Sequence, residues 1–203
     1  MIRDLACDPE TIAGPIDVRV VEELRRRYPL DDDFVQQLAA CHGAVPGIGT
    51  FSVGTKTGTV ARFLTLLDFD SALTGPKRPH FEHVDTDERV MIGIPYLLDG
   101  GHQTSRTLFT NLVPFAALLD GMNLDHGYVD LLCLDCRDRT KKTPVVVWIG
   151  DSATDASMEW DGLPIEQQFD ADGDFVNVPW DDFLLPVASD FGAFISSLQE
   201  NTA

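Results

Sequence analysis

The sequence has few cysteines, few basic residues and no long apolar run. Its four cysteines among 203 residues are too few for a disulfide framework, so we expect free thiols. No apolar stretch approaches the ~20 residues that span a bilayer. The first residues, MIRDLACDPE, are charged almost at once and lack the apolar core of a signal peptide. The composition of 44% hydrophobic and 24% charged residues predicts a folded protein. Without a predicted membrane span or signal peptide, we expect it in the cytoplasm.

The shortage of basic residues is the most informative of these features. The chain has 15 Lys and Arg against 33 Asp and Glu, which gives a net charge of −18. From Thr143 to Ala203 there is no Lys or Arg but there are twelve acidic residues. Such a field repels nucleic acid and anionic membranes and favours a cationic partner. The acidity also serves solubility alone in many proteins, and composition does not decide between the two explanations.

Apolar periodicity predicts two helices near the start of the chain and one near its end. In DVRVVEELRRRYP, Val20, Val21, Leu24 and Tyr28 recur at helical spacing before Pro29. LDDDFVQQLAACHG predicts a second helix, with aspartates in its first turn, a buried stripe and a glycine stop; the stripe is Phe34, Val35, Leu38 and Cys41, and the stop is Gly43. SDFGAFISSLQE predicts a closing helix that Ser189 caps, with an apolar face of Phe191, Phe194, Ile195 and Leu198.

Between these helices the pattern favours strands. AVPGIGTFSVGTKTGTV suits a hairpin or a mobile loop, and VARFLTLLDF predicts a strand. RVMIGIPYLL and LVPFAALL are apolar runs that fit buried strands or short helices, and the two prolines in residues 74–87 predict a loop. YVDLLCLDC and PVVVWIG predict a strand pair joined by the basic turn RDRTKKT, and FLLPVA predicts a further strand.

Together these elements predict an α+β fold. We expect a single domain over residues 16–203, preceded by an N-terminal arm over residues 1–15. Its mainly antiparallel β-sheet would be packed by the N-terminal and C-terminal helices.

The segment DHGYVDLLCLDCRD contains a Cys-x-x-Cys, Cys133 and Cys136, that raises the question of a metal or redox site. Such zinc sites place the pair in a turn and add a second pair of ligands. Here the flanking residues favour a strand, on which positions i and i+3 point to opposite faces. We therefore expect two separate thiols and no metal.

The remaining polar motifs fit known sites poorly. His80 and His83 lie in a Pro-flanked loop and lack the spacing of a zinc protease, and Ser105 lacks the context of a nucleophile elbow. In DADGDFVNVPWD, Asp170, Asp172, Asp174 and Asp181 match positions 1, 3, 5 and 12 of a calcium loop. Its glycine is at position 4 instead of 6, so an acidic surface loop is favoured over a calcium site. We expect no catalytic residue, metal or cofactor.

Several motifs in order resemble the SUKH superfamily of cell-wall-assembly-regulator-like proteins. DDDFVQQLAACHGAVPG resembles a family helix that begins with an aromatic residue and ends about eight residues later in Asn-Gly or a similar pair. In this sequence Phe34 is the aromatic residue and His42-Gly43 is the pair. LVPFA, VDLLCLDCRD and TPVVVWIGD resemble its Pro-Phe-Ala strand, its Asp-x-x-Cys strand and its Val-rich strand, and VASDFGAFISSL resembles its closing strand and helix. The similarity runs from about Leu30 to Leu198, with His42 in place of the usual Asn and Cys136 in place of Tyr.

The resemblance implies a single α+β domain that binds a partner and catalyses nothing. Bacterial members are mostly immunity proteins that neutralise a cognate polymorphic toxin, often a nuclease. A nuclease surface is basic, which agrees with the charge argument. A regulatory or scaffold module without a toxin partner is the alternative. We expect the partner contacts among acidic residues and two possible aromatic anchors: Trp160, Asp161, Asp170, Asp172, Asp174, Trp180, Asp181 and Asp182.

Overall fold

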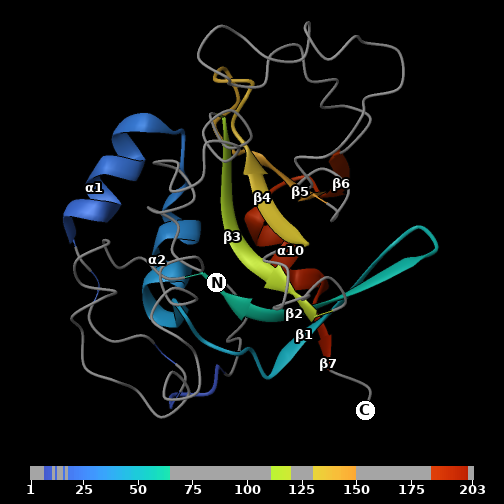
Figure 1. Cartoon of the computed structure of the whole chain (residues 1–203). Coiled ribbons are helices and arrows are strands. Elements are labelled where there is room, and N and C mark those ends of the chain that lie inside the picture. Colours follow the sequence, from blue (N-terminus) through green and yellow to red (C-terminus); the bar gives the residue numbers. More distant parts are fainter. Residues whose placement is uncertain are drawn as a thin grey trace, which may run out of the picture.

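A computed structural model describes residues 7–10, 12, 16, 18–64, 111–119, 130–149 and 184–200. The strand or short helix expected for RVMIGIPYLL, the loop predicted for residues 74–87 and most of the predicted N-terminal arm lie outside these ranges. The described residues form one sheet and three helices around a common core, which confirms the α+β class (Figure 1). None of these helices is both long enough and apolar enough to cross a bilayer.

The sheet has seven strands in the order β6-β5-β4-β3-β2-β1-β7, and every neighbouring pair is antiparallel. The first six strands therefore follow one another as a meander. Their bounds are β1 Ile48–Val53, β2 Lys56–Phe63, β3 Leu112–Leu118, β4 Leu131–Asp135, β5 Val145–Ile149 and β6 Leu184–Ala188. The predictions for LVPFAALL, for the YVDLLCLDC and PVVVWIG pair and for FLLPVA are confirmed. In VARFLTLLDF the strand ends at Phe63, having begun earlier, at Lys56.

Irregular pairing accompanies the two prolines inside the sheet. Pro114 lies in the central strand β3, next to a shift in register between Pro114 and Ala116. Pro186 lies on the outer strand β6 at a second shift. Proline has no N–H for the ladder, so it is tolerated in a sheet at bulges or edges, and each of these residues occupies such a position. Bulges also increase the local twist and bend of a sheet.

Two helices precede the sheet, as the periodicity predicts. Helix α1, Val18–Arg27, buries Leu24, and the following Tyr28 is also buried. Helix α2, Asp32–Cys41, buries Phe34, Leu38 and Cys41. Asp31 caps α2, since its side chain accepts a 2.6 Å hydrogen bond from the N–H of Phe34. Gly43 follows with φ 75°, the left-handed conformation in which a glycine stop is favoured.

The closing helix differs from the prediction at both ends. Asp190, and not Ser189, caps helix α10, Phe191–Ser197, by accepting a 2.7 Å hydrogen bond from the N–H of Ala193. Ser189 instead donates its hydroxyl to Asp190. The helix ends at Ser197, and Gln199–Glu200 forms strand β7 beside β1. A carboxylate is a strong N-cap acceptor. Gln199 and Glu200 pair with β1 across the sheet in place of a further helical turn.

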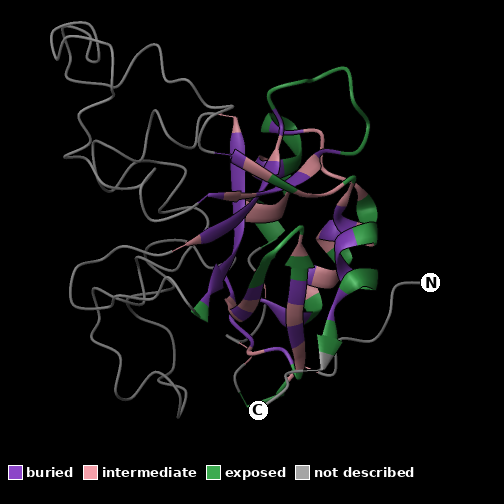
Figure 2. Cartoon of the chain, turned by 90° about the vertical axis from the view of Figure 1, so that its right-hand side faces the viewer, coloured by how far each residue is buried: buried purple, intermediate pink, exposed green. Residues whose placement is uncertain are grey.

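Aromatic rings from helix α2, helix α10 and the sheet form the centre of the core. Phe34 of α2 and Phe191 of α10 meet edge to face at 5.0 Å between ring centroids, and Phe115 of β3 lies 5.4 Å from Phe191. Edge-to-face pairs of this kind add stability beyond the area that they bury. Helices α2 and α10 thus lie on one face of the sheet, and in Figure 2 the exposed residues gather on the helices and turns while the strands are mostly buried.

The sheet is strongly curled. A flat sheet would place β1 and β5 about 19 Å apart, because three strands lie between them. The rings of Phe51 on β1 and Trp148 on β5 nevertheless meet with centroids 5.8 Å apart, and Phe51 also lies 5.5 Å from Phe194 of α10. The sheet therefore bends around α10 and brings its first strands toward its last.

Candidate functional site

The residues predicted to contact a partner all lie outside the described ranges. They are Trp160, Asp161, Asp170, Asp172, Asp174, Trp180, Asp181 and Asp182. The same holds for the weak calcium motif at Asp170–Asp181, for His80 and His83, and for Ser105. These predictions stay predictions. The candidate site therefore rests on the described residues, which we call the framework.

The Cys-x-x-Cys begins on a central strand and ends just beyond it. Cys133 lies within β4, opposite Pro114 on one side and Val147 on the other. Cys136 follows the last residue of the strand, and its N–H donates a 2.8 Å hydrogen bond to the carbonyl of Asn111. Both side chains are buried and both thiols are free.

Burial keeps these two thiols protonated. It raises the pKa of Cys133 well above the ordinary value, and it raises the pKa of Cys136 to about 12, with the neighbouring Asp135 adding to the effect. A thiol attacks as the thiolate, so neither group is activated as a nucleophile at neutral pH. Within the described ranges, no three His, Cys, Asp or Glu side chains converge as metal ligands.

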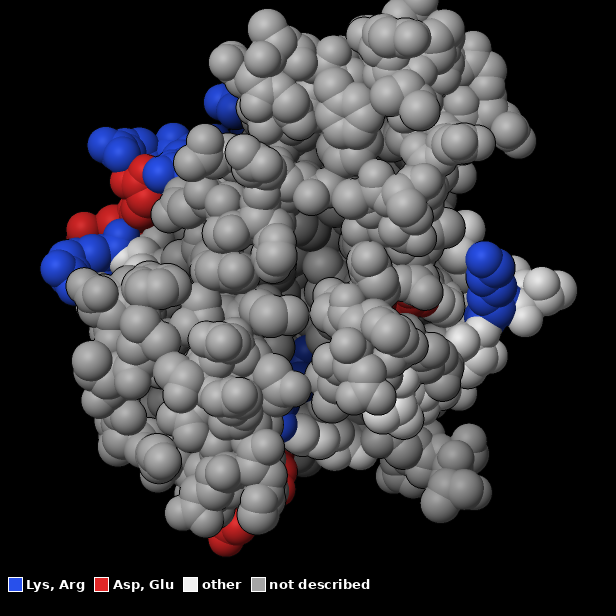
Figure 3. Space-filling model, viewed as in Figure 1, with Lys and Arg blue, Asp and Glu red and all other residues white. Residues whose placement is uncertain are grey.

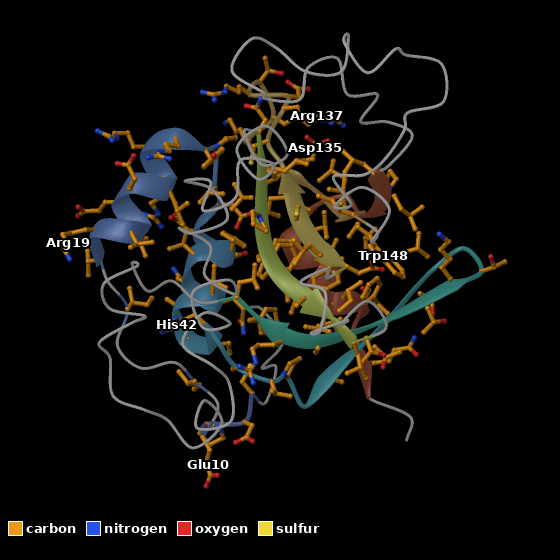
Figure 4. All side chains as sticks on the ribbon, viewed as in Figure 1. Glu10, Arg19, His42, Asp135, Arg137 and Trp148 are labelled. Atoms are coloured by element: carbon orange, nitrogen blue, oxygen red, sulfur yellow. The ribbon has the colours of Figure 1, made fainter. Side chains whose placement is uncertain are left out.

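The turn between β4 and β5 is basic and well fixed. Arg137 binds Asp135 through two of its nitrogens, at 2.9 and 2.8 Å. Asp138 accepts hydrogen bonds from the N–H and the hydroxyl of Thr140, at 3.0 and 2.6 Å, and these bonds hold the pKa of Asp138 below its ordinary value. Figure 4 shows Asp135 and Arg137 together at the end of the sheet where this turn lies. The exposed Arg139, Lys141 and Lys142 complete the turn.

A second cluster surrounds Trp148, the single tryptophan within the described ranges. Its indole N–H donates a 2.7 Å hydrogen bond to the carboxylate of Asp130, which directly precedes β4. Lys56, near the tip of the β1–β2 hairpin, places its ammonium 5.9 Å from the centroid of the Trp148 ring. The ring thus connects three segments distant in sequence. Sequence reasoning missed this cluster, because alternation along VVVWI could place Trp148 on a face of the strand but could not bring the hairpin to it.

His42 is the single polar residue among the fully buried side chains that the structure describes. It directly follows α2, where the backbone of Gly43 bonds to Leu64 at 3.3 Å and that of Ala44 to Cys41 at 2.9 Å. Figure 4 shows His42 beside α2. The neighbouring Cys41 accepts a hydrogen bond from Gln37 at 3.4 Å. This environment suits a structural residue that closes the helix.

The charge of the chain is divided unevenly between the framework and the rest. The described ranges hold 10 of the 15 Lys and Arg and 12 of the 33 Asp and Glu, a net of 10 − 12 = −2. The remaining residues therefore carry 5 − 21 = −16 of the total −18. On the framework, opposite charges are interleaved: Arg26 and Arg27 bind Glu23, and Arg25 binds Asp32 at 2.6 Å. Figure 3 shows basic and acidic atoms mixed along the edge of the molecule where α1 lies.

The described framework thus offers a curled antiparallel sheet, protonated buried thiols, a basic turn and a half-buried tryptophan, while most of the acidity belongs to the segments inserted between its strands. No family model, no curated protein and no solved structure matches the chain.

Proposed function

We propose that this chain is an immunity protein, which binds a cognate protein toxin through acidic segments and neutralises it without catalysis. The observation that carries the proposal is the division of charge. The described residues have a net charge of −2, whereas the segments between the described strands (65–110, 120–129 and 150–183) have 4 − 19 = −15. A binding role gives a reason for acidic residues to gather in particular segments, which solubility alone does not require.

The order of the elements supports the proposal further. The motifs that resemble the SUKH superfamily fall on α2, β3, β4, β5 and then β6 with α10, in the sequence that the resemblance implies. Cys133, which corresponds to a family position that also carries Cys, is a fully buried residue of β4. A core position explains why that residue type occurs there without any chemical role.

A basic toxin is the partner that this charge suits. Complementary charge increases the rate of association by steering, and it discriminates against partners of the same sign. A nuclease must hold phosphates and so presents a basic surface, which acidic segments can occupy. The basic β4–β5 turn would face away from such a partner, since like charges across an interface weaken binding.

Co-expression tests the proposal directly. The toxin to use is the product of the open reading frame immediately upstream of the gene, if it ends in a variable toxin domain. Cells that express that domain should survive when this chain is co-expressed and should die without it. Survival of neither culture, with the chain present as soluble protein, would contradict the proposal. A chain that binds host proteins but not the toxin would favour the scaffold alternative.

A matched pair of variants tests the acidic segment. Reversal of Asp172, Asp174 and Asp181 to Lys should slow association with the toxin at least tenfold at low salt. The control reverses Glu10, Glu22 and Asp33, three exposed acidic residues of the framework, and changes the net charge by the same amount. Surface plasmon resonance at 20 mM and 500 mM NaCl measures both. Equal slowing in the two variants would show that net charge alone matters and would reject the predicted contact residues.

A further inference from the structure

Four neighbouring strands begin or end in one row at one end of the sheet. The paired residues of this row are Ala117 of β3, Leu131 of β4, Ile149 of β5 and Leu184 of β6. Because the strands are antiparallel, β3 and β5 end within one residue of the row, and β4 and β6 begin at it. Residues 120–129 therefore join β3 to β4 at this end, and residues 150–183 join β5 to β6. We call it the insertion end of the sheet.

Opposite charges belong to the two ends of these strands. The two segments joined at the insertion end, 120–129 and 150–183, contain twelve Asp and Glu and no Lys or Arg. The basic β4–β5 turn joins the other ends of its strands, where Asp135 pairs with Val145. The third inserted segment, 65–110, has only 4 − 7 = −3 and rejoins the sheet beside that turn, at Asn111. Figure 4 shows Asp135 and Arg137 at one end of the sheet and Trp148 toward the other.

A fixed tryptophan lies at the insertion end. Trp148 directly precedes Ile149, and its indole N–H donates the 2.7 Å hydrogen bond to Asp130, which directly precedes Leu131. The ring of Phe51 meets the indole from the core side at 5.8 Å. Part of the Trp148 side chain nevertheless stays exposed. An aromatic side chain that is already held in place loses little conformational freedom when a partner covers it, and tryptophan is a frequent anchor of protein interfaces.

An exposed leucine lies at the same end. Leu119 directly follows Leu118, whose N–H donates a 2.9 Å hydrogen bond to the carbonyl of Asp130. Its exposed fraction is 59%, and within the described ranges Val18 is the other large hydrophobic side chain that is exposed. Val18 begins α1, and its neighbour Arg19 lies far from Trp148 in Figure 4. Single exposed leucines are common, so the position of Leu119 beside Asp130 is the informative feature.

We propose that the insertion end is the surface of the framework that docks the basic toxin, with Trp148 and Leu119 as apolar anchors. The inference rests on the proposed function and places its interface on the framework. The acidic segments joined there attract the partner, and the anchors supply the desolvated contact that an interface needs. The basic turn then lies at the end away from the partner. Lys56, with its ammonium 5.9 Å from the Trp148 ring centroid, is a like charge close to the partner.

The two exposed hydrophobic residues form a matched pair of variants. Leu119→Ser and Val18→Ser each replace an exposed apolar side chain by a small polar one, so both chains should stay folded. Surface plasmon resonance measures their binding to the toxin domain of the upstream open reading frame. Leu119→Ser should raise the dissociation constant about fivefold or more, and Val18→Ser should change it less than about twofold. Equal dissociation constants in the two variants would overturn the docking surface.

A second matched pair tests which end of the sheet meets the partner. Lys56→Met and Lys141→Met remove the same charge at the insertion end and at the basic turn. At 20 mM NaCl, Lys56→Met should associate with the toxin domain about two- to fivefold faster than Lys141→Met, because a like charge near the partner slows association more than a distant one. Equal rates, or faster association of Lys141→Met, would contradict docking at the insertion end.

Trp148→Phe tests the aromatic anchor. It keeps a ring for Phe51 but loses the indole, and it should raise the dissociation constant about tenfold, with a melting temperature above that of the assay. An unchanged dissociation constant would remove Trp148 from the surface. A toxin domain that the unmodified chain does not bind would overturn the proposed function together with this surface. Tight binding by the unmodified chain and equally by Leu119→Ser and Trp148→Phe would overturn the surface alone.

Discussion

At the scale of single residues, Asp31 combines a stabilising cap with an unfavourable charge. Burial raises the pKa of its carboxyl above the ordinary value, although the N–H of Phe34 lowers it, and Asp33, Asp190 and Asp32 add repulsion. Because the folded pKa is higher than the unfolded one, the proton stabilises the fold. That stability is fully present below the unfolded pKa of about 3.9 and is lost as the pH rises through the folded value.

Asp31→Asn should therefore unfold at pH 7 with a free energy equal to or above that of the unmodified chain. Asparagine keeps an oxygen for the Phe34 N–H and removes the buried charge. Asp31→Ala removes the cap and should lower the free energy of unfolding by about 1 kcal/mol. Urea unfolding at pH 7 and pH 4 measures both, and the unmodified chain should gain on the Asn variant as the pH falls. An Asn variant that is weaker at pH 7 but equal at pH 4 would show that the carboxylate stabilises the fold.

At the scale of elements, the β1–β2 hairpin depends on Gly58, whose Cα the ring of Phe51 covers. A Cβ at Gly58 would lie 2.6 Å from Cζ of Phe51, and that ring is fixed between Phe194 and Trp148. Gly58→Ala should lower the free energy of unfolding by about 1–3 kcal/mol through overpacking. Gly192→Ala in α10 is the comparison, because its Cβ would meet only Asp190 at 3.4 Å and alanine favours a helix by up to ~1 kcal/mol. A Gly58→Ala variant as stable as Gly192→Ala would show that Phe51 can move aside.

Elements with a local signal could be predicted, and those that depend on distant partners could not. Continuous apolar residues mark β3 and β4 in the sequence, and the 3.6-residue stripe of Phe34, Leu38 and Cys41 marks α2. Strand β7 has two residues, Gln199–Glu200, and forms by pairing with β1, so no local sequence pattern predicts it. The curl of the sheet and the cluster around Trp148 likewise arise from contacts between segments about 90 residues apart along the chain.

At the scale of the whole molecule, the net charge of −18 makes salt stabilising. Folding concentrates like charges, and the Debye length falls from about 30 Å at 0.01 M to about 3 Å at 1 M ionic strength. The melting temperature should therefore rise with NaCl over this range. The rise should be smaller when three acidic residues are reversed to lysine, because the net charge then falls to −18 + 6 = −12. A melting temperature that falls with NaCl would mean that specific ion pairs, such as Arg25 with Asp32, outweigh the general repulsion.

Salt should act in the opposite direction on partner binding. The same charge that opposes folding attracts a basic partner, so screening that stabilises the chain should slow its association with the toxin. Between 20 and 500 mM NaCl we expect the association rate constant to fall at least tenfold while the melting temperature rises. Stopped-flow fluorescence and calorimetry on one preparation measure the two quantities. An association rate constant and a melting temperature that both rise, or both fall, with NaCl would contradict a common electrostatic origin. That result would separate the acidity of the chain from the binding role proposed for it.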